Sequence, residues 1–115
     1  MIKIYHNKMC SKSRQTLGLI NETKQDVQIF EYLNDEIDEK ELRFIIEQLN
    51  ISPLDLIRKG EAIFKENYKS KTLTDEEWIG AMLKYPKLIE RPIVINNGKV
   101  IIGRPPEKVL TIIGG

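Results

Sequence analysis

The sequence contains a single cysteine, Cys10, among its 115 residues. One cysteine excludes an internal disulfide, and a small chain without disulfides is typical of a reducing compartment, so we expect a cytoplasmic protein. No apolar run approaches the roughly 20 residues that span a bilayer, and the first residues lack the charged and apolar regions of a signal peptide. The sequence therefore predicts no contact with a membrane.

An excess of charge is also missing, because 18 Lys and Arg residues oppose 17 Asp and Glu residues and leave a net charge of +1. Such a balance gives no basis for binding nucleic acid through bulk electrostatics. The one histidine, His6, has no group of partners at metal-ligand spacing, so we expect no metal and no bound cofactor. The length fits a single domain over residues 1–115, which we expect to be a monomer.

The first third of the chain has the pattern of a strand, a helix and a second strand. Residues 2–5 are strand-like, a helix is predicted to begin at Cys10 or Ser11, and the second strand runs from Val27 to about Leu33. Strand, helix and strand within about 30 residues form a βαβ unit, in which the two strands are parallel and the crossover is right-handed.

A helical insertion is predicted over about residues 36–88. Asp38 and Thr74 each precede a Glu by three residues, which is the spacing of a capping box at a helix start. Ser52-Pro53 supplies an N-cap and a first helical residue, and a proline ends the last helix of the insertion.

The last third of the chain returns to strands. Asn97-Gly98 between two β-branched runs is a strong hairpin signal, and Pro105 opens a final helix. The inward-facing residues of that helix are predicted to be Val109, Leu110 and Ile113. The element order β-α-β, helical insertion, β-β-α predicts an α/β fold with a mixed four-stranded sheet.

Cys10 stands where a thiol is activated, between the end of a strand and the start of a helix. The unpaired N–H groups and the positive dipole end of a helix N-terminus favour thiolate over thiol. Lys8, Lys12 and Arg14 add positive charge, and Ser13 offers a hydroxyl to the sulfur. The alternative is a buried structural cysteine, but the polar neighbours of Cys10 indicate a thiol that is not deeply buried.

Ser13 occupies the place that a second cysteine takes in a C-x-x-C motif. The second thiol of such a motif resolves a mixed disulfide within the chain, which a serine cannot do. Any covalent intermediate on Cys10 must therefore be resolved by a thiol from outside, such as glutathione or a small redox protein.

Three arginines occur near turns or element ends: Arg58, Arg91 and Arg104. A guanidinium binds a tetrahedral oxyanion through paired hydrogen bonds and stays charged at any working pH. Three of them converging on a thiolate would hold an anionic substrate. From the residues alone, a solvated or ion-paired surface role is open for each. The Arg91-Pro92 bond is open to both the trans and the cis form.

Three separated motifs resemble those of the glutaredoxin-coupled arsenate reductases. The first contains Ile4-Tyr5-His6-Asn7, Cys10, Ser13-Arg14 and Thr16-Leu17, the second covers residues 51–59, and the third joins Glu90-Arg91-Pro92-Ile93-Val94 to Gly103-Arg104-Pro105-Pro106. The likeness covers nearly the whole chain in the right order, and residues 101–110 indicate the short, compact branch of that family.

The resemblance implies a thioredoxin-like fold with a helical insertion, in agreement with the element order. It also implies a role for each candidate residue. Cys10 is the implied nucleophile, the oxyanion-binding residues are Arg58, Arg91 and Arg104, and the proline beside the site is Pro92. Three further residues match family positions in secondary roles, namely His6, Ser13 and Arg14.

The implied reaction reduces arsenate, or a similar oxyanion, through a thiolate–arsenic adduct on Cys10, with glutathione as co-substrate and glutaredoxin as partner. Reducing As(V) to As(III) takes two electrons and hence two thiols, of which this chain supplies one. One alternative is a glutathione-dependent thiol-disulfide reductase of the same fold, whose arginines bind carboxylates. The other is a redox-related regulator that binds RNA polymerase, although such proteins usually carry the second cysteine that Ser13 replaces.

Overall fold

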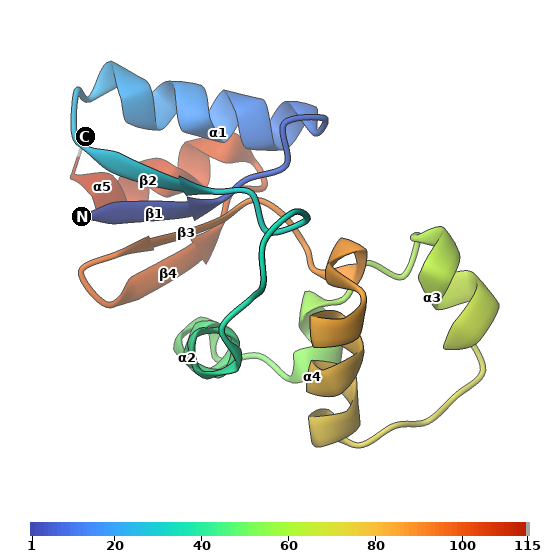
Figure 1. Cartoon of the computed structure of the whole chain (residues 1–115). Coiled ribbons are helices and arrows are strands. Elements are labelled where there is room, and N and C mark those ends of the chain that lie inside the picture. Colours follow the sequence, from blue (N-terminus) through green and yellow to red (C-terminus); the bar gives the residue numbers. More distant parts are fainter. Residues whose placement is uncertain (115) are drawn as a thin grey trace. The chain divides into compact units, whose positions relative to one another are not determined.

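The computed structural model, which describes residues 1–114, contains a mixed four-stranded sheet in the order β2-β1-β3-β4 (Figure 1). β1 (Ile2–Tyr5) lies parallel to β2 (Val27–Phe30) and antiparallel to β3 (Ile93–Asn96), which in turn pairs antiparallel with β4 (Lys99–Ile102). The parallel pair confirms the predicted βαβ unit. The sheet as a whole confirms the predicted α/β class.

Two compact units make up the chain. The sheet unit comprises residues 1–36 and the chain from Arg91 onward, and the insertion unit comprises Ile37–Glu90. The sheet unit holds the four strands together with α1 (Ser11–Glu22), the 3₁₀ turn η3 (Pro106–Val109) and α5 (Leu110–Ile113). Across residues 1–114, every helix is too short or too polar to cross a membrane.

The core of the sheet unit lies between the sheet and its helices. Ile2 and Ile4 alternate along β1 and so point to the same face of the sheet. They pack with residues from α1, β3 and the C-terminal helical segment. The buried members of this cluster are Ile2, Ile4, Ile20, Val94, Val109 and Ile113. Each aliphatic side chain buried in this way contributes about 1.5–3 kcal/mol to stability.

The predicted hairpin joins β3 to β4. Asn97 and Gly98 both adopt positive φ, 52° and 77°, as a two-residue hairpin turn of the type that Asn-Gly favours. The hairpin is attached to the C-terminal helix because the Asn96 side-chain Nδ2 donates to the Ile112 carbonyl at 2.8 Å. The hairpin prediction is therefore confirmed.

The insertion unit is helical, as its sequence pattern predicts. Its elements are α2 (Glu39–Leu49), η1 (Pro53–Leu56), α3 (Ala62–Asn67), α4 (Asp75–Lys84) and η2 (Pro86–Leu88). Thr74 and Glu77 form the predicted capping box at the start of α4, with side-chain to backbone distances of 3.2 and 3.0 Å. Asp38 caps α2 by accepting from the Lys40 N–H at 3.0 Å.

Two details of the sequence prediction are wrong. Leu110 was expected to face inward, but it is 43% exposed, because it lies about 100° around the helix from Val109 whereas Ile113 returns to the buried face. The second strand ends at Phe30 rather than near Leu33, because the Asn34 N–H donates to the Glu31 carbonyl and turns the chain.

Candidate active site

Cys10 caps the N-terminus of α1, as its sequence position predicts. The chain turns after β1 so that the Cys10 N–H donates to the Asn7 carbonyl at 3.0 Å. Cys10 itself is extended, and its carbonyl accepts from the Arg14 N–H at 3.0 Å as the first helical hydrogen bond. Cys10 therefore lies at the junction between this loop and α1. The unpaired backbone N–H groups of the first helical turn are next to it.

The expectation that Cys10 is not deeply buried is wrong. The residue is 7% exposed, whereas the preceding Met9 is 82% exposed. The turn directs the Met9 side chain to solvent and the Cys10 side chain inward, so polar neighbours in sequence do not make this thiol open to solvent.

A buried pair of polar side chains holds the turn that leads to Cys10. Ser13 Oγ accepts from the Asn7 N–H at 3.0 Å and lies 2.7 Å from His6 Nδ1. Burial lowers the pKa of His6 below its ordinary value of 6.5, against the smaller raising effect of the Glu31 carboxylate. The hydroxyl that was offered to the sulfur in the sequence analysis thus binds the turn, together with His6.

Arg14 binds the same turn from outside. Its guanidinium Nη1 donates to the Lys8 carbonyl at 2.9 Å, and both side chains are exposed. Arg14 therefore stabilises the turn before Cys10 by a side-chain to backbone hydrogen bond.

The strand register brings two of the three predicted arginines to the same end of the sheet as Cys10. Tyr5 at the end of β1 pairs with Ile93 at the start of β3, which pairs with Ile102 at the end of β4. Arg91 lies just before the start of β3, and Arg104 lies just after the end of β4. The strand pairing alone therefore places both arginines beside the chain that leads from β1 to Cys10. Both arginines are half-buried, and Arg104 Nη1 donates to the Arg91 carbonyl at 3.3 Å.

The two prolines that follow these arginines have cis peptide bonds. Arg91-Pro92 takes the cis form, one of the two that the sequence left open, and Arg104-Pro105 is cis as well. Pro92 is buried, and its carbonyl accepts from the Gly103 N–H at 2.9 Å. The two Arg-Pro segments are thus joined directly to one another through main-chain hydrogen bonding.

Gly103 brings the end of β4 into close contact with α1. The Thr16 hydroxyl donates to the Lys12 carbonyl at 2.8 Å and lies 3.4 Å from the Gly103 carbonyl. A Cβ on residue 103 would stand 2.6 Å from Thr16 Oγ1 and 2.8 Å from Pro92 Cγ. Only glycine permits this approach. The residue before Arg104 is therefore packed directly against α1.

Sequence reasoning placed Thr16 and Gly103 in motifs but gave them no role. Their contact joins residues 87 positions apart, which no local pattern reveals. A usable signal is Thr16 itself, a polar residue on the buried side of α1 beside Ser13 and Ile20.

Arg58 belongs to the insertion unit. It makes ion pairs there, which is one of the two roles that the residues alone left open. Its guanidinium lies 3.1 Å from Glu61 and 3.4 Å from Glu90. The Arg58 N–H also donates to the Leu88 carbonyl at 2.7 Å, which fixes the backbone of this segment. A role for Arg58 at an oxyanion site stays a prediction.

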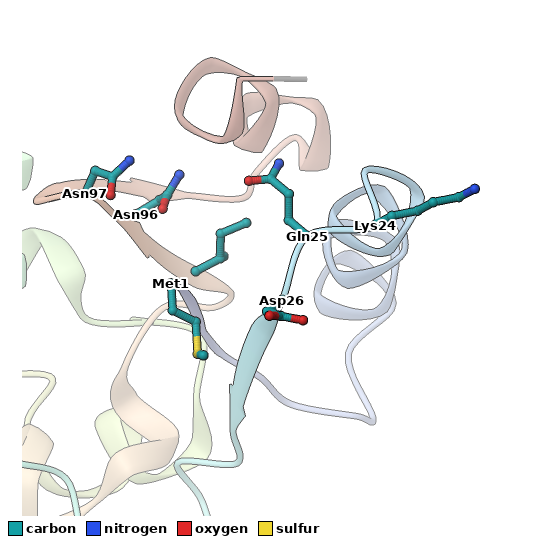
Figure 2. Close-up of a pocket in the computed structure, with 7 residues that line it drawn as sticks. Met1, Lys24, Gln25, Asp26, Asn96 and Asn97 are labelled. Carbon is teal, nitrogen blue, oxygen red and sulfur yellow. The ribbon is translucent and has the colours of Figure 1, made fainter.

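Two pockets of the sheet unit lie at opposite ends of β1. One, of about 590 Å³, lies at the hairpin end, where Figure 2 shows Lys24 extending away from the other labelled residues. Two amide side chains of this pocket make structural hydrogen bonds. Gln25 Nε2 donates to the Ile113 carbonyl at 2.8 Å, and Asn96 Nδ2 donates to the Ile112 carbonyl. The other pocket, of about 180 Å³, borders the turn that ends at Cys10. Within residues 1–114, His, Cys, Asp and Glu side chains form no group of three or more suited to a metal ion.

The sequence matches one protein family over most of its length. The ArsC family model covers residues 5–112. The chain belongs to the ArsC family. An Escherichia coli K12 protein named "Uncharacterized protein YfgD" is 46% identical over 98% of this chain and 97% of its own. An arsenate reductase of Haemophilus influenzae is 42% identical over 96% of this chain and 97% of its own.

A solved structure of the same family agrees with the fold. The arsenate reductase from Vibrio cholerae matches with a TM-score of 0.90 at 41% identity, over 97% of each chain. Membership of the ArsC family and its thioredoxin-like fold, both implied by the three motifs, are therefore confirmed. The matched residues 5–112 include Cys10 and all three arginines.

Proposed function

We propose that this ArsC-family protein reduces arsenate to arsenite, with Cys10 as the nucleophile and glutathione as the source of the second thiol. The observation that carries the proposal is the strand register, which gathers Cys10, Arg91 and Arg104 at one end of the sheet unit. Arsenate reductases that are 35–42% identical to this chain support the same reaction.

The arginines supply the binding site for the oxyanion. Arsenate is tetrahedral and negatively charged at neutral pH, so its oxygens accept paired hydrogen bonds from guanidinium groups. We assign this role to Arg91 and Arg104 in the sheet unit, and the same role for Arg58 stays a prediction from the resemblance. Donors held in place before reaction also stabilise the charge that develops on the arsenate oxygens during attack.

The first covalent step forms a bond between Cys10 sulfur and arsenic. The thiolate attacks the arsenic atom, and one arsenate oxygen takes up protons and leaves as water. Arsenic remains As(V) in this thiolate–arsenic adduct. The burial of Cys10 favours the adduct, because it limits the water that could hydrolyse the arsenic–sulfur bond.

The second step transfers the electrons. The glutathione thiolate attacks Cys10 sulfur, a disulfide forms, and the arsenic–sulfur bond breaks with its electron pair on arsenic. Arsenic leaves as arsenite, As(III), and each of the two sulfurs has been oxidised by one electron. Because the chain has no second cysteine, glutaredoxin then takes the glutathione from Cys10 by thiol–disulfide exchange.

A coupled assay tests the proposal. Purified protein with arsenate, glutathione and glutaredoxin should oxidise NADPH through glutathione reductase, at a rate that depends on arsenate. Cys10→Ser should abolish that rate. A rate that is the same without arsenate, but that requires a glutathionylated substrate, would support the thiol-disulfide reductase instead. Absence of both rates would overturn the proposed function.

A further inference from the structure

A small pocket opens beside the turn that carries Cys10. It has a volume of about 180 Å³ and lies between two loops that follow neighbouring parallel strands. The loop after β1 contributes His6, Asn7, Lys8 and Met9, and the loop after β2 contributes Glu31, Leu33 and Asn34. The crevice outside the carboxyl ends of parallel strands commonly holds ligands in α/β proteins. β1 and β2 are such a parallel pair, and the pocket lies where both strands end.

This pocket lies on one side of β1, and the segments that carry Arg91 and Arg104 lie on the other. The pocket lies on the β2 side, whereas Arg91 precedes β3 on the other side. Cys10 follows directly in the chain after Met9, a residue of the pocket wall. A ligand in this pocket would therefore use groups other than Arg91 and Arg104.

The lining of the pocket combines opposite charges with apolar surface. Lys8 is exposed and Glu31 is half-buried, so residues of opposite charge line the same pocket. Met9 and Leu33 are 82% and 37% exposed, so each wall of the pocket offers an apolar side chain to a ligand. Asn7 already uses its side-chain oxygen to accept from the Met9 N–H at 3.0 Å, which fixes the turn that forms one wall.

We propose that this pocket binds the thiol co-substrate as a small peptide that carries both an amine and a carboxylate, with glutathione as the ligand. The inference rests on the proposed function, because it names where the second thiol binds. Lys8 pairs with a peptide carboxylate, Glu31 pairs with the peptide amine, and Met9 and Leu33 contact the uncharged middle of the peptide. The peptide thiol then reaches Cys10 from the side opposite to Arg91.

A binding experiment tests this site without any reaction. S-methylglutathione has the charges of glutathione but no free thiol, so it binds without being oxidised. Titrated into isotope-labelled protein, it should shift the NMR signals of the Asn34 amide, the Met9 methyl and the Leu33 methyls. The signals of Asn97 and Gly98 at the other end of the sheet should stay in place. Shifts confined to other residues would overturn the assignment of the pocket.

Charge reversal supplies matched variants. Lys8→Glu should weaken the binding of S-methylglutathione about tenfold or more, since it replaces an attractive charge by a repulsive one. Lys99→Glu makes the same change at an exposed residue of the hairpin and should leave the dissociation constant within about twofold. Equal weakening by both variants would show that only net charge matters and would contradict the site.

An apolar pair of variants tests the peptide contact. Leu33→Ala should weaken binding several-fold, whereas Leu110→Ala, at a residue of similar exposure outside the pocket, should not. The binding experiment and the arsenate assay test the two proposals independently. Binding at the pocket without arsenate turnover would retain this site and reject arsenate reduction. Turnover with glutathione but no binding at the pocket would retain arsenate reduction and reject this site.

Discussion

The two ends of the sheet unit use their polar side chains differently. At the hairpin end, the amides of Gln25 and Asn96 donate to carbonyls of the C-terminal helix and so hold the fold together. At the other end, Ser13 and His6 hold the turn before Cys10, and the strand register adds Arg91 and Arg104. The same four strands thus end in a network of structural hydrogen bonds at one end, and beside the thiol of Cys10 and two arginines at the other.

The largest expected difference between the two ends is in catalysis. Cys10→Ser should remove arsenate-dependent turnover entirely, because a serine hydroxyl is a far weaker nucleophile than a thiolate and cannot form the mixed disulfide. Thermal unfolding should change little, which a melting curve checks. Asn97→Ser at the hairpin end is the matched control and should keep the wild-type rate. Turnover retained in Cys10→Ser would contradict the account.

Removal of a guanidinium should have the next largest effect. Arg104→Ala should raise the KM for arsenate about 10- to 100-fold, the cost of losing hydrogen bonds to a charged ligand. The control is Arg43→Ala in the insertion unit, where the guanidinium pairs with Glu39 and Glu76 on the surface. Steady-state kinetics should show an unchanged KM for that control. An equal rise in both variants would count against an anion site at Arg104.

Alanine substitutions at two glycines, one at each end of the sheet unit, compare the packing at the two ends. Gly103→Ala should destabilise the protein by about 1–3 kcal/mol, because the new Cβ meets Thr16 and Pro92 in a packed site. It should also raise the KM for arsenate, since Arg104 follows directly. Gly98→Ala should cost about 1–2 kcal/mol through its positive φ alone, with open space around it and no change in KM. Urea unfolding and kinetics on both variants measure this contrast.

The smallest expected effect is a pH dependence from His6. Its pKa is lowered in the folded protein by burial, so the unfolded chain takes up a proton first as the pH falls. The contribution of neutral His6 is therefore complete above the ordinary pKa of about 6.5 and declines as the pH falls below it toward the folded value. Urea unfolding of the wild type and His6→Asn between pH 5 and 8 measures it. The difference in stability between the two should shrink toward low pH, and a constant difference would contradict the burial argument.

The sequence predicts well those features that depend on neighbouring residues. The Asn97-Gly98 turn and the Thr74 capping box are set by local backbone chemistry, and Cys10 at a helix start follows from the change in hydrophobic period. The burial of Cys10 was missed because it depends on which way one turn directs Met9. The contact of Gly103 with Thr16 was missed because the two residues are far apart in the sequence. It also depends on the lack of a Cβ at Gly103, which no local pattern reveals.

The ion pairs of Arg58 show a further limit of sequence reasoning. Glu61 lies three residues away and is a partner that spacing alone suggests, but Glu90 comes together with Arg58 only through folding of the insertion unit. A pattern of three arginines near element ends therefore predicted an anion site without revealing which carboxylates already pair with one of them.

The most direct test of the central claim is the intact mass of the protein after a single round of reaction. Wild-type protein mixed with arsenate and glutathione, without glutaredoxin, should gain the mass of one glutathione, located on Cys10 by peptide mapping. The gain should require arsenate and disappear on addition of glutaredoxin. An unmodified protein that still produces arsenite, or an adduct that forms equally well without arsenate, would contradict the claim that Cys10 reduces the oxyanion with the help of an external thiol.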